Sequence, residues 1–366
     1  MNKKKIIIIT NSLSGLYSFR RELIAALLEK EYSVLISSPE DPFKESYFRN
    51  IGCEVINTPL NSRGLNPISD LILIFRYLWI LLKEKPYMVL SYTIKPNVYG
   101  GILCRILGIC QIVNITGLGD AIENGGVLQK ILLCMYRIAI NKSFHVFFQN
   151  SSNMLFCHRN GIAVNNSSLI KGSGVNVDFH SFQKYPTDEV IKFLFIARVL
   201  KSKGIDEYLY AAKQIRKKYN NTEFQILGSC NGEYMDTIEA LQREGIVRYL
   251  GETNDVRPFI SCVHCTVLPS YHEGMSNVNL ESQSAGRPVI TSNVPGCYET
   301  IIDKETGFLV NVKDSHDLIN KIEYFINLPI EQKITMGYKA REWVACNFSR
   351  QQIIDTYLHT ILSYNV

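Results

Sequence analysis

Residues 5–37 read KIIIITNSLSGLYSFRRELIAALLEKEYSVLIS, and this stretch decides the fold class. Ile6–Ile9 form an unbroken apolar run of the kind found in strands that are buried on both faces. A polar turn over Asn11–Gly15 and an amphipathic helix over Tyr17–Lys30 are predicted next, and a second strand over Tyr32–Ser37 follows. Strand, turn, helix and strand in this order predict a βαβ unit of a parallel sheet.

The same alternation continues along the chain in two series. The first series adds predicted strands over residues 54–57, 88–92, 111–115 and 145–149. The second series has predicted strands over residues 192–197, 223–227, 247–250, 266–268 and 288–291. We therefore predict an α/β protein with two Rossmann-like parallel-sheet domains, since 366 residues suit two domains of about 150 residues each.

A polar stretch over residues 180–189, which contains Pro186, is the expected joint between the two domains. It divides the chain into an N-terminal domain over residues 1–185 and a C-terminal domain over residues 186–347. Residues 348–366 are predicted to form a helix that crosses back onto the first domain. Sheets of this type bind ligands beyond the carboxyl ends of their strands, so two facing sheets are expected to enclose one cleft.

The composition excludes several classes of protein. Hydrophobic residues make up 46% of the chain and charged residues 20%, which is typical of folded globular domains. The net charge of +5 is too small to indicate a nucleic-acid binder, and it suits phosphate groups or an anionic membrane surface. The apolar run at Ile6–Ile9 is too short for the core of a signal peptide.

Ten cysteines are spread along the chain, and most of them lie in apolar segments. The following are predicted to be small core residues rather than disulfide partners: Cys53, Cys104, Cys110, Cys134, Cys157, Cys262 and Cys265. Cys262 and Cys265 form a C-x-x-C pair, but no second pair follows at the spacing of a zinc site. No metal site is predicted from them.

The segment Glu273-Gly-Met-Ser-Asn-Val-Asn-Leu-Glu281 carries the clearest chemical signal. It follows a predicted strand, and a helix is predicted from Asn277, so backbone N–H groups of the first turn point out of the sheet edge. A helix start of this kind binds anions such as a diphosphate. Glu281 is placed to accept two hydrogen bonds from the hydroxyls of a ribose, and Glu273 to do so for a sugar. The alternative is that both glutamates are ordinary capping and surface charges.

This segment resembles the E-x7-E signature of glycosyltransferase family 4, a family of retaining enzymes with the GT-B fold, and residues 285–290 (AGRPVI) resemble its continuation. Residues 197–204 (ARVLKSKG) are similar to the family's G-R-x-x-x-x-K-G element, with Ala197 in place of the usual glycine. Residues 174–178 (GVNVD), together with Phe182, resemble a third element that precedes the domain joint. Three motifs in the family's order are far more specific than any one of them.

The resemblance implies a role for each matched residue. Arg198 and Lys203 would neutralise the diphosphate of the donor. Glu281 would bind its ribose, and Glu273 would contact the transferred sugar. Backbone N–H groups for the sugar and phosphate would come from the loop residues Gly274, Met275, Ser276 and Asn277. The chain has no D-x-D sequence, the metal clamp of the other main glycosyltransferase fold, so we expect the two cations and the helix start to replace a metal and expect no cofactor.

The predicted acceptor side lies in the N-terminal domain. In the first strand-to-helix loop the family often has two glycines, and only Gly15 remains here for close approach to the donor. Residues 91–97 (SYTIKPN) and 114–120 (NITGLGD) resemble family members that build bacterial capsule, O-antigen or N-glycan precursors on polyprenyl diphosphate. The resemblance implies acceptor binding by Lys95, Asn97, Thr116 and Gly117, and orientation of the attacking hydroxyl by Asp120. Plain loop structure is the alternative for residues 116–120.

The longest apolar stretch, Ile68–Leu82, is interrupted by two charged residues and is shorter than the roughly 20 residues of a spanning helix. It carries and adjoins basic and aromatic residues that suit a membrane interface: Arg76, Tyr77, Trp79, Lys83 and Lys85. A core helix packed on the sheet is the alternative. The interfacial interpretation predicts a cytoplasmic protein that associates peripherally with the inner face of the cytoplasmic membrane.

The sequence therefore predicts a retaining glycosyltransferase that moves a hexose or N-acetylhexosamine from a nucleotide sugar, expected to be a UDP-sugar, to a lipid-linked saccharide. Retention is implied by the resemblance alone, and no residue is an obvious covalent nucleophile. Two alternatives remain at this point, a UDP-sugar 2-epimerase of the same architecture and a non-catalytic subunit that binds sugar nucleotides.

Overall fold

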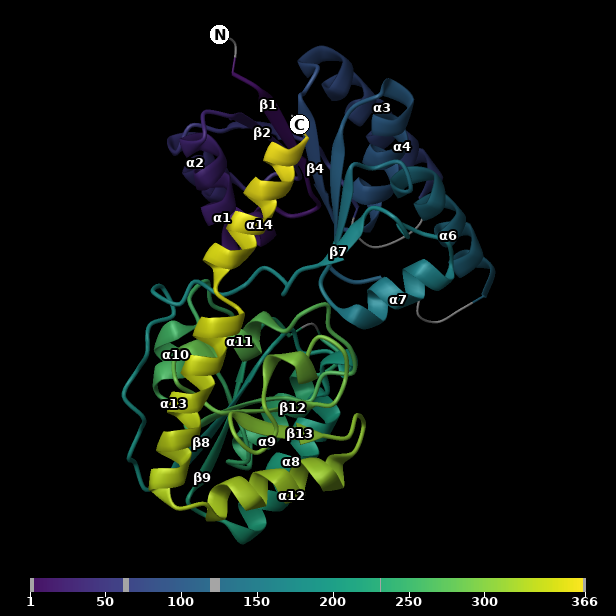
Figure 1. The fold of residues 1–366 in the computed structure, drawn as a ribbon. Helices are drawn as coiled ribbons and strands as arrows, with labels where there is room; N and C mark the ends of the chain where they lie inside the picture. The colour runs from purple at the N-terminus through teal and green to yellow at the C-terminus, as the bar shows by residue number, and fades with distance from the viewer. Residues whose placement is uncertain (1–2, 62–65, 119–125, 231, 365–366) are drawn as a thin grey trace. The chain divides into compact units, whose positions relative to one another are not determined.

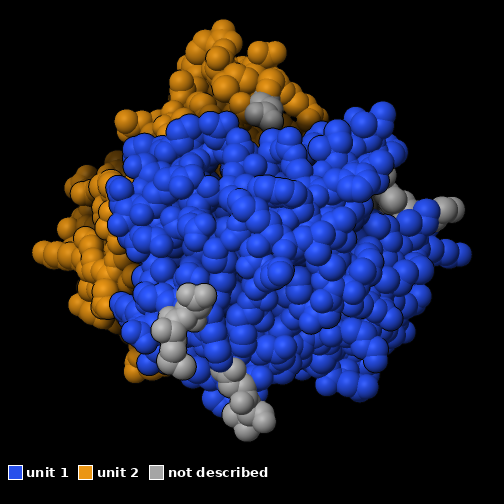
Figure 2. Space-filling model, turned by 90° about the horizontal axis from the view of Figure 1, so that it is seen from above, with its two compact units in different colours: residues 1–173, 353–366 blue, residues 174–352 orange. Residues whose placement is uncertain are grey.

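A computed structural model describes residues 3–61, 66–118, 126–230 and 232–364 of the chain (Figure 1). The chain forms two compact units, which are coloured separately in Figure 2. Unit 1 comprises residues 1–173 and 353–366, and unit 2 comprises residues 174–352. Each unit is built around one parallel sheet, which confirms the predicted fold class of two Rossmann-like domains.

Within the described residues, the sheet of unit 1 has seven parallel strands in the order β3-β2-β1-β4-β5-β6-β7. The strands are β1 (Lys5–Ile9), β2 (Ser33–Ser38), β3 (Glu54–Asn57), β4 (Met88–Tyr92), β5 (Gln111–Ile115), β6 (His145–Phe148) and β7 (Ser167–Leu169). The strand order reverses between β1 and β4. The loops that follow these two strands therefore lie at the switch point where sheets of this type bind ligands.

Helices cover both faces of this sheet. They are α1 (Leu13–Glu29), α2 (Pro42–Asn50), α3 (Pro67–Glu84), the π-helix η1 (Pro96–Gly100), α4 (Gly101–Leu107), α6 (Gly126–Ile140), α7 (Ser151–Arg159) and α14 (Arg350–Ser363). Helices α1, α2 and α14 share a core with Ile6 and Ile8, whereas α3 and α4 share one with Ile7 and Ile9. Side chains alternate between the two faces of a strand, and helices cover both faces here. All four isoleucines of β1 are therefore buried, as the unbroken apolar run predicts.

Two features of unit 1 differ from the sequence prediction. Helix α1 begins at Leu13, earlier than predicted, because Oγ of Ser12 accepts a hydrogen bond from the backbone N–H of Gly15 at 3.0 Å and caps the helix. The predicted polar turn over residues 11–15 is therefore too long. Strand β7 was missed because its three residues, Ser-Ser-Leu, carry no strand pattern.

Unit 2 has a six-stranded parallel sheet in the order β10-β9-β8-β11-β12-β13 among the described residues. The strands are β8 (Ile191–Ile196), β9 (Thr222–Leu227), β10 (Arg248–Tyr249), β11 (Cys265–Leu268), β12 (Val289–Ser292) and β13 (Gly307–Val310). The helices are the 3-10 helix η2 (Lys201–Lys203), α8 (Ile205–Lys218), α9 (Met235–Arg243), α10 (Arg257–Ser261), α11 (Asn277–Ser284), the 3-10 helix η3 (Tyr298–Thr300), α12 (Ser315–Asn327) and α13 (Ile330–Asn347). The strand order reverses between β8 and β11.

The segment predicted as the joint, residues 180–189, lies within unit 2. Hydrogen bonds attach the residues around its start to the end of that unit. Val175 forms an isolated bridge with Ser349, and Nη1 of Arg341 donates to the carbonyl oxygens of Val177 and His180 at 2.8 and 3.1 Å. These partners are far apart in the sequence, so local composition carries no sign of the contact.

The predicted burial of the cysteines is correct for five of the seven. Cys134 and Cys262 are exposed: Cys134 lies on the solvent side of α6, and Cys262 directly follows the end of α10. The remaining five are buried: Cys53, Cys104, Cys110, Cys157 and Cys265. All ten cysteines are free thiols.

Gly204 is a position in unit 2 where a side chain has no room. Its φ is +75°, and a Cβ would lie 2.0 Å from the carbonyl oxygen of Pro269. We expect Gly204→Ala to lower the free energy of unfolding by roughly 2–5 kcal/mol, measured by urea denaturation. Gly245→Ala is the matched control, because its φ is +70° with nothing within 4 Å, and it should cost about 1–2 kcal/mol. Equal losses in the two variants would contradict the close approach.

Candidate active site

The two loops at the switch point of unit 2 contain the segments that resemble family 4. Residues 197–204 follow β8, and residues 269–276 follow β11. The backbone N–H of Tyr271 donates to the carbonyl oxygen of Ser202 at 2.9 Å, and Oγ of Ser270 lies 3.2 Å from the same oxygen. The tertiary structure thus joins two motifs that lie far apart in the sequence.

Lys203 and Glu273 form a direct ion pair across these loops. Nζ of Lys203 lies 2.6 Å from Oε1 of Glu273, and Oγ of Ser270 donates to the same oxygen at 2.9 Å. Both charged side chains are partly exposed. The residue predicted to neutralise phosphate is therefore in contact with the residue predicted to contact the sugar, and a bound donor must share or replace this pair.

Arg198 is exposed at the end of β8. Among the residues that the structure describes, none forms a hydrogen bond or ion pair with its side chain. Ala197, which stands before it in place of the family's glycine, has its carbonyl group packed against Gly228, where a Cβ would lie 1.9 Å from that oxygen. Close backbone approach at this strand end depends on Gly228, which the sequence analysis did not identify.

A glycine outside the Glu273–Glu281 motif packs against the loop that follows Glu273. Gly296 has a φ of +81°, and a Cβ there would lie 2.4 Å from the carbonyl oxygen of Glu273 and 2.8 Å from that of Gly274. The carbonyl oxygen of Gly296 accepts a hydrogen bond from the backbone N–H of Ser276 at 2.7 Å. Only a residue without a side chain fits here, and the sequence analysis missed it.

The loop ends in a capped helix start. Oγ of Ser276 accepts the backbone N–H of Asn279 at 3.3 Å, so Ser276 is the N-cap of α11. The side chain of Met275 is buried beside Leu280 and Val344, which leaves only its backbone for a ligand. Asn277 is the first residue of the helix and is half-buried.

Helix α11 is buried although its sequence is polar. Nδ2 of Asn279 donates to the hydroxyl oxygens of Thr291 and Thr300 at 3.2 and 3.0 Å. Nε2 of Gln283 donates to the carbonyl oxygen of Thr300 at 2.8 Å. Buried polar groups need hydrogen-bond partners, and here the threonines around β12 supply them. This polar lining fixes the helix start at the sheet edge.

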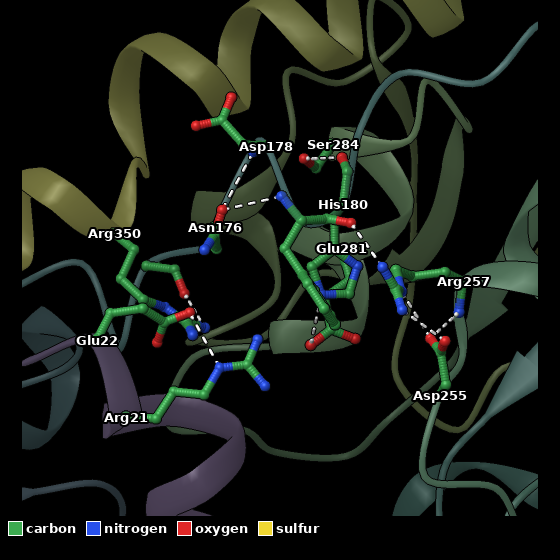
Figure 3. A network of polar contacts seen from close by, with 12 residues as sticks. Arg21, Glu22, Asn176, Asp178, His180, Asp255, Arg257, Glu281, Ser284 and Arg350 are labelled. Atoms are coloured by element: carbon green, nitrogen blue, oxygen red, sulfur yellow. Dashed lines mark hydrogen bonds and ion pairs between the residues drawn. The ribbon is translucent and has the colours of Figure 1, made fainter. Parts of the chain in front are cut away.

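Glu281 lies one turn into α11 in an environment that disfavours its charge. Burial raises its pKa to about 7, Arg350 opposes the rise, and Asp255 adds to it. Nε2 of His180 lies 3.9 Å from Oε1 of Glu281, and Figure 3 shows the two side chains facing each other. Glu281 therefore changes its charge near neutral pH.

A hollow of about 260 Å³ lies beside His180 in unit 2. Its lining includes Phe179, Asp255 and Arg257. Cζ of Arg257 lies 3.7 Å from the centre of the Phe179 ring. Figure 3 shows the pair that Arg257 forms with Asp255, in which Nη2 lies 2.7 Å from Oδ2. The sequence analysis identified none of these three residues, because the ring, the cation and the carboxylate meet only in three dimensions.

In unit 1, Lys95 follows β4 and is already paired. Its Nζ lies 2.6 Å from Oδ1 of Asp70 on α3, and the hydroxyl of Tyr99 donates to Oδ2 of the same carboxylate at 3.0 Å. The Lys95 and Asp70 side chains are both largely buried. The acceptor-binding role of Lys95 stays a prediction, and a phosphate would have to compete with Asp70.

The other predicted acceptor residues lie at the same edge of the sheet. Asn97 is buried, and its Nδ2 donates to the carbonyl oxygen of Asn114 at 2.9 Å. Thr116 and Gly117 follow β5, and a Cβ at Gly117 would meet nothing within 4 Å. Asp120 lies outside the described residues.

Gly15 belongs to the first turn of α1 rather than to an open loop. Its backbone N–H is used by the Ser12 cap, and a Cβ at Gly15 would meet only the Ser12 side chain at 3.5 Å, which is ordinary contact. Nothing in this geometry requires glycine. Its predicted contact with the donor stays a prediction.

No group of three or more His, Cys, Asp or Glu residues could hold a metal ion within the described ranges. The C-x-x-C pair is divided, because Cys265 is buried and Cys262 is exposed. The expectation that transfer needs no metal stays a prediction.

Comparison with known proteins identifies one family match for each half of the chain. Residues 5–150 match the family described as Glycosyl transferase 4-like, and residues 177–343 match Glycosyl transferases group 1. The chain is 25% identical over 331 residues to the N,N'-diacetylbacillosaminyl-diphospho-undecaprenol alpha-1,3-N-acetylgalactosaminyltransferase of Campylobacter jejuni, covering 86% of this chain and 87% of that protein. It is 28% identical over 309 residues to the capsular polysaccharide biosynthesis glycosyltransferase CapM of Staphylococcus aureus, with 80% of each covered.

Solved structures share the fold over almost the whole chain. Anabaena Alr3699/HepE in complex with UDP and glucose has a TM-score of 0.79 at 15% identity, covering 98% of this chain and 100% of that chain. Sucrose-phosphate synthase from Thermosynechococcus elongatus has a TM-score of 0.80 at 19% identity, with 100% of each covered. At these identities the likeness shows the GT-B fold alone. Together with the two family matches, it means that the chain belongs to the group 1 and 4-like glycosyltransferases and is a sugar-transferring enzyme.

Proposed function

We propose that this enzyme moves a hexose or N-acetylhexosamine from a UDP-sugar to a saccharide on polyprenyl diphosphate, with retention of configuration, in bacterial surface polysaccharide biosynthesis. The observation that carries the donor part is the meeting of Lys203, Glu273 and the start of α11 at one sheet edge. The acceptor part is supported by the C. jejuni relative, whose name gives an undecaprenol-linked sugar, and by CapM. The UDP part is supported by the HepE complexes with UDP and UDP-glucose.

In this proposal, Arg198, Lys203 and the α11 N-terminus hold the donor diphosphate. Negative charge grows on the phosphates as the nucleoside diphosphate leaves, and positive groups that are already in place stabilise that charge. A helix N-terminus adds partial positive charge and free N–H groups. These groups neutralise the phosphate charge that a metal ion would otherwise neutralise. Lys203 also orients the carboxylate of Glu273 toward the sugar hydroxyls.

The proposed chemistry needs no covalent intermediate. The acceptor hydroxyl attacks the anomeric carbon from the side on which the diphosphate leaves, as the resemblance implies. The bond between carbon and phosphate oxygen breaks while the new glycosidic bond forms, and a phosphate oxygen takes the hydroxyl proton. The protein's tasks are then to hold the diphosphate, to position the sugar and to admit the acceptor.

A transfer assay tests the proposal, with UDP-sugars as donors, a polyprenyl-diphosphate saccharide as acceptor and excess EDTA. We expect a lengthened glycan whose new linkage has the donor's anomeric configuration. An epimerase would instead interconvert UDP-sugars without acceptor, and a non-catalytic subunit would leave every donor unchanged. Activity that EDTA abolishes and magnesium or manganese restores would show that the charge neutralisation is misassigned.

The donor residues are expected to have different kinetic signatures. Arg198→Ala and Lys203→Ala remove charges that act most strongly in the transition state, so kcat should fall by roughly 10²-fold or more. Glu281→Ala removes a ribose contact that is similar in ground and transition states, so KM for the donor should rise more than kcat falls. Glu273→Gln should lower the rate to an intermediate degree and alter sugar selectivity.

Steady-state kinetics on folded variants check this series. Lys339→Ala is the control, since it also removes one positive charge from unit 2 but breaks only an exposed pair with Glu305. It should leave kcat and KM unchanged. Near-normal kcat in both Arg198→Ala and Lys203→Ala would rule out the proposed diphosphate site.

Donor binding should depend on pH through Glu281. Its carboxylate accepts ribose hydroxyls only when ionised, and its pKa is about 7, so affinity for a nucleotide sugar should rise about tenfold between pH 6 and 8. Arg350, Asp255 and His180 are the charged and titratable groups near it. Isothermal titration should show this rise in the wild type and a flat profile in Glu281→Gln. A flat wild-type profile would contradict the assignment.

The same group links pH to stability. The folded-state pKa of Glu281 lies above the usual 4.5, so the folded protein binds the proton more tightly than the unfolded chain. Its contribution therefore favours folding below pH 4.5 and is lost progressively as pH rises from about 4.5 to about 7. Glu281→Gln should accordingly raise the free energy of unfolding at pH 8 while it weakens donor binding.

Helix α3 supports the proposed membrane association. Leu73, Tyr77, Ile80 and Leu81 pack on the sheet, which agrees with the core alternative for this face. The opposite face exposes one apolar stripe: Ile68, Leu71, Ile72, Phe75, Trp79 and Leu82. In the described part of the chain, no helix is long and apolar enough to cross a membrane.

We propose that this stripe binds the anionic leaflet of a bilayer, because positively charged residues lie close to it. Basic residues lie within and beside it, and Nζ of Lys83 lies 4.8 Å from the centre of the Trp79 ring. Aromatic side chains with basic neighbours suit the headgroup region. The same helix carries Asp70, the partner of Lys95, so it connects the stripe with the predicted acceptor loop.

Binding to anionic liposomes should weaken with salt, and Trp79→Glu should weaken it by about tenfold or more in a sedimentation assay. Tyr324→Glu in unit 2 is the control, because Tyr324 is 58% exposed and Trp79 is 56% exposed. It should not change binding. If the wild-type protein does not bind anionic liposomes, α3 is not a membrane-binding surface.

A further inference from the structure

Arg20 on α1 is a buried cation with an unusual set of neighbours. It is only 4% exposed. Other buried arginines of the described chain have oxygen partners: Arg287 donates to the carbonyl oxygens of Ile260 and Ser261, and Arg350 donates to that of Gly174. For Arg20, no hydrogen bond or ion pair of the side chain exists within the described residues.

Two tyrosine rings surround the guanidinium of Arg20. Its Cζ lies 5.3 Å from the ring centre of Tyr92, the last residue of β4, and 5.5 Å from that of Tyr357 on α14. Helices α1 and α14 pack on the same face of the sheet (Figure 1). The rings attract the cation through their faces, but they provide no acceptor for its five N–H groups. Burial without acceptors is costly for such a group.

A second polar group nearby, the buried hydroxyl of Tyr92, has no hydrogen-bond partner of standard geometry. Burial and a contact with the Tyr357 hydroxyl raise the pKa of this group. The hydroxyl of Tyr357, in contrast, receives a hydrogen bond from Nδ2 of Asn114, whose Oδ1 receives one from Gln149. One donor-rich cation and one hydroxyl without a standard hydrogen bond therefore lie together at the carboxyl ends of β4 and β5, beside the switch point of the unit 1 sheet.

We propose that Arg20, with the hydroxyl of Tyr92, binds a phosphate-type oxyanion, and that this anion is the diphosphate of the lipid-linked acceptor. The inference rests on the proposed function. A planar guanidinium matches the oxygens of a phosphate group, and a tyrosine hydroxyl can donate to a further oxygen. The long side chain can turn its head toward the sheet edge while its stem stays buried.

Charge pairing favours the acceptor over the donor as the source of the anion. Lys95, the cation predicted to hold the acceptor phosphate, is already engaged by Asp70 at 2.6 Å. Arg20 lies in the same unit and forms no ion pair with any of the described residues. The donor diphosphate has its own proposed ligands in unit 2, namely Arg198, Lys203 and the start of α11.

The test separates acceptor binding from donor binding. In Arg20→Met, KM for the polyprenyl-diphosphate saccharide should rise at least tenfold, whereas KM for the donor and the slow hydrolysis of UDP-sugar without acceptor should stay unchanged. Arg20→Lys, which keeps the charge but loses the planar fork, should lie between. Arg49→Met is the matched control, because it removes an exposed arginine from unit 1 that pairs only locally with Glu45 and Val55.

Inorganic pyrophosphate serves as the probe for the anion itself. It should raise the melting temperature of Arg20→Met less than that of the wild type and of Arg49→Met, because only the proposed donor site still binds it in Arg20→Met. If pyrophosphate protection is smaller in Arg20→Met while the acceptor KM is unchanged, the site binds free phosphate and the acceptor assignment is wrong. A folded Arg20→Met with unchanged acceptor KM and unchanged protection overturns the proposal.

Tyr92→Phe covers the case in which Arg20→Met does not fold. It keeps the ring beside Arg20 and removes only a hydroxyl without a partner, so stability should not fall. Its acceptor KM should rise several-fold, and an unchanged value would overturn the role of the hydroxyl. Absence of UDP-sugar hydrolysis in the wild type would instead count against the proposed function, whatever the pyrophosphate result.

Discussion

The proposed donor site depends on the contact between the loops that follow β8 and β11 in unit 2. The backbone at Gly204 passes so close to Pro269 that a Cβ would lie 2.0 Å from its carbonyl oxygen, and Gly296 approaches Glu273 and Gly274 in a similar way. Both glycines have positive φ, a conformation that side chains disfavour. Because these contacts fix the two loops, Lys203 pairs with Glu273 close to the capped N-terminus of α11.

Two of the cations that we propose to bind phosphate are paired with carboxylates of the protein. Lys203 is paired with Glu273, and Lys95 with Asp70. A ligand phosphate must therefore exchange partners with a carboxylate rather than meet a free cation. Such an exchange lowers affinity for simple anions, because only a ligand that also satisfies the displaced carboxylate recovers the loss. A sugar diphosphate can do both, since its hydroxyls can donate to Glu273.

Glu281, the proposed ribose ligand, destabilises the folded protein when its side chain is ionised. Its position in α11 places a carboxyl group where burial raises its pKa to about 7, so ionising it at neutral pH opposes folding. The polar lining of α11 does not relieve this cost, because Thr291 and Thr300 accept hydrogen bonds from Asn279 and Gln283 on the same helix. Ribose hydroxyls would provide the missing donors, so donor binding should recover part of the stability.

The sequence by itself determined most strands of the two parallel sheets, the final helix and the motifs of the proposed donor site, because apolar periodicity and short spacing act locally along the chain. It could not determine which of these charged residues are paired, or that Phe179, Asp255 and Arg257 line one hollow. It also gave no sign that Arg20 is buried between Tyr92 and Tyr357, since these residues come from a helix, a strand end and the last helix. Such contacts follow from strand order and helix packing, which bring distant residues together, and only the tertiary structure decides them.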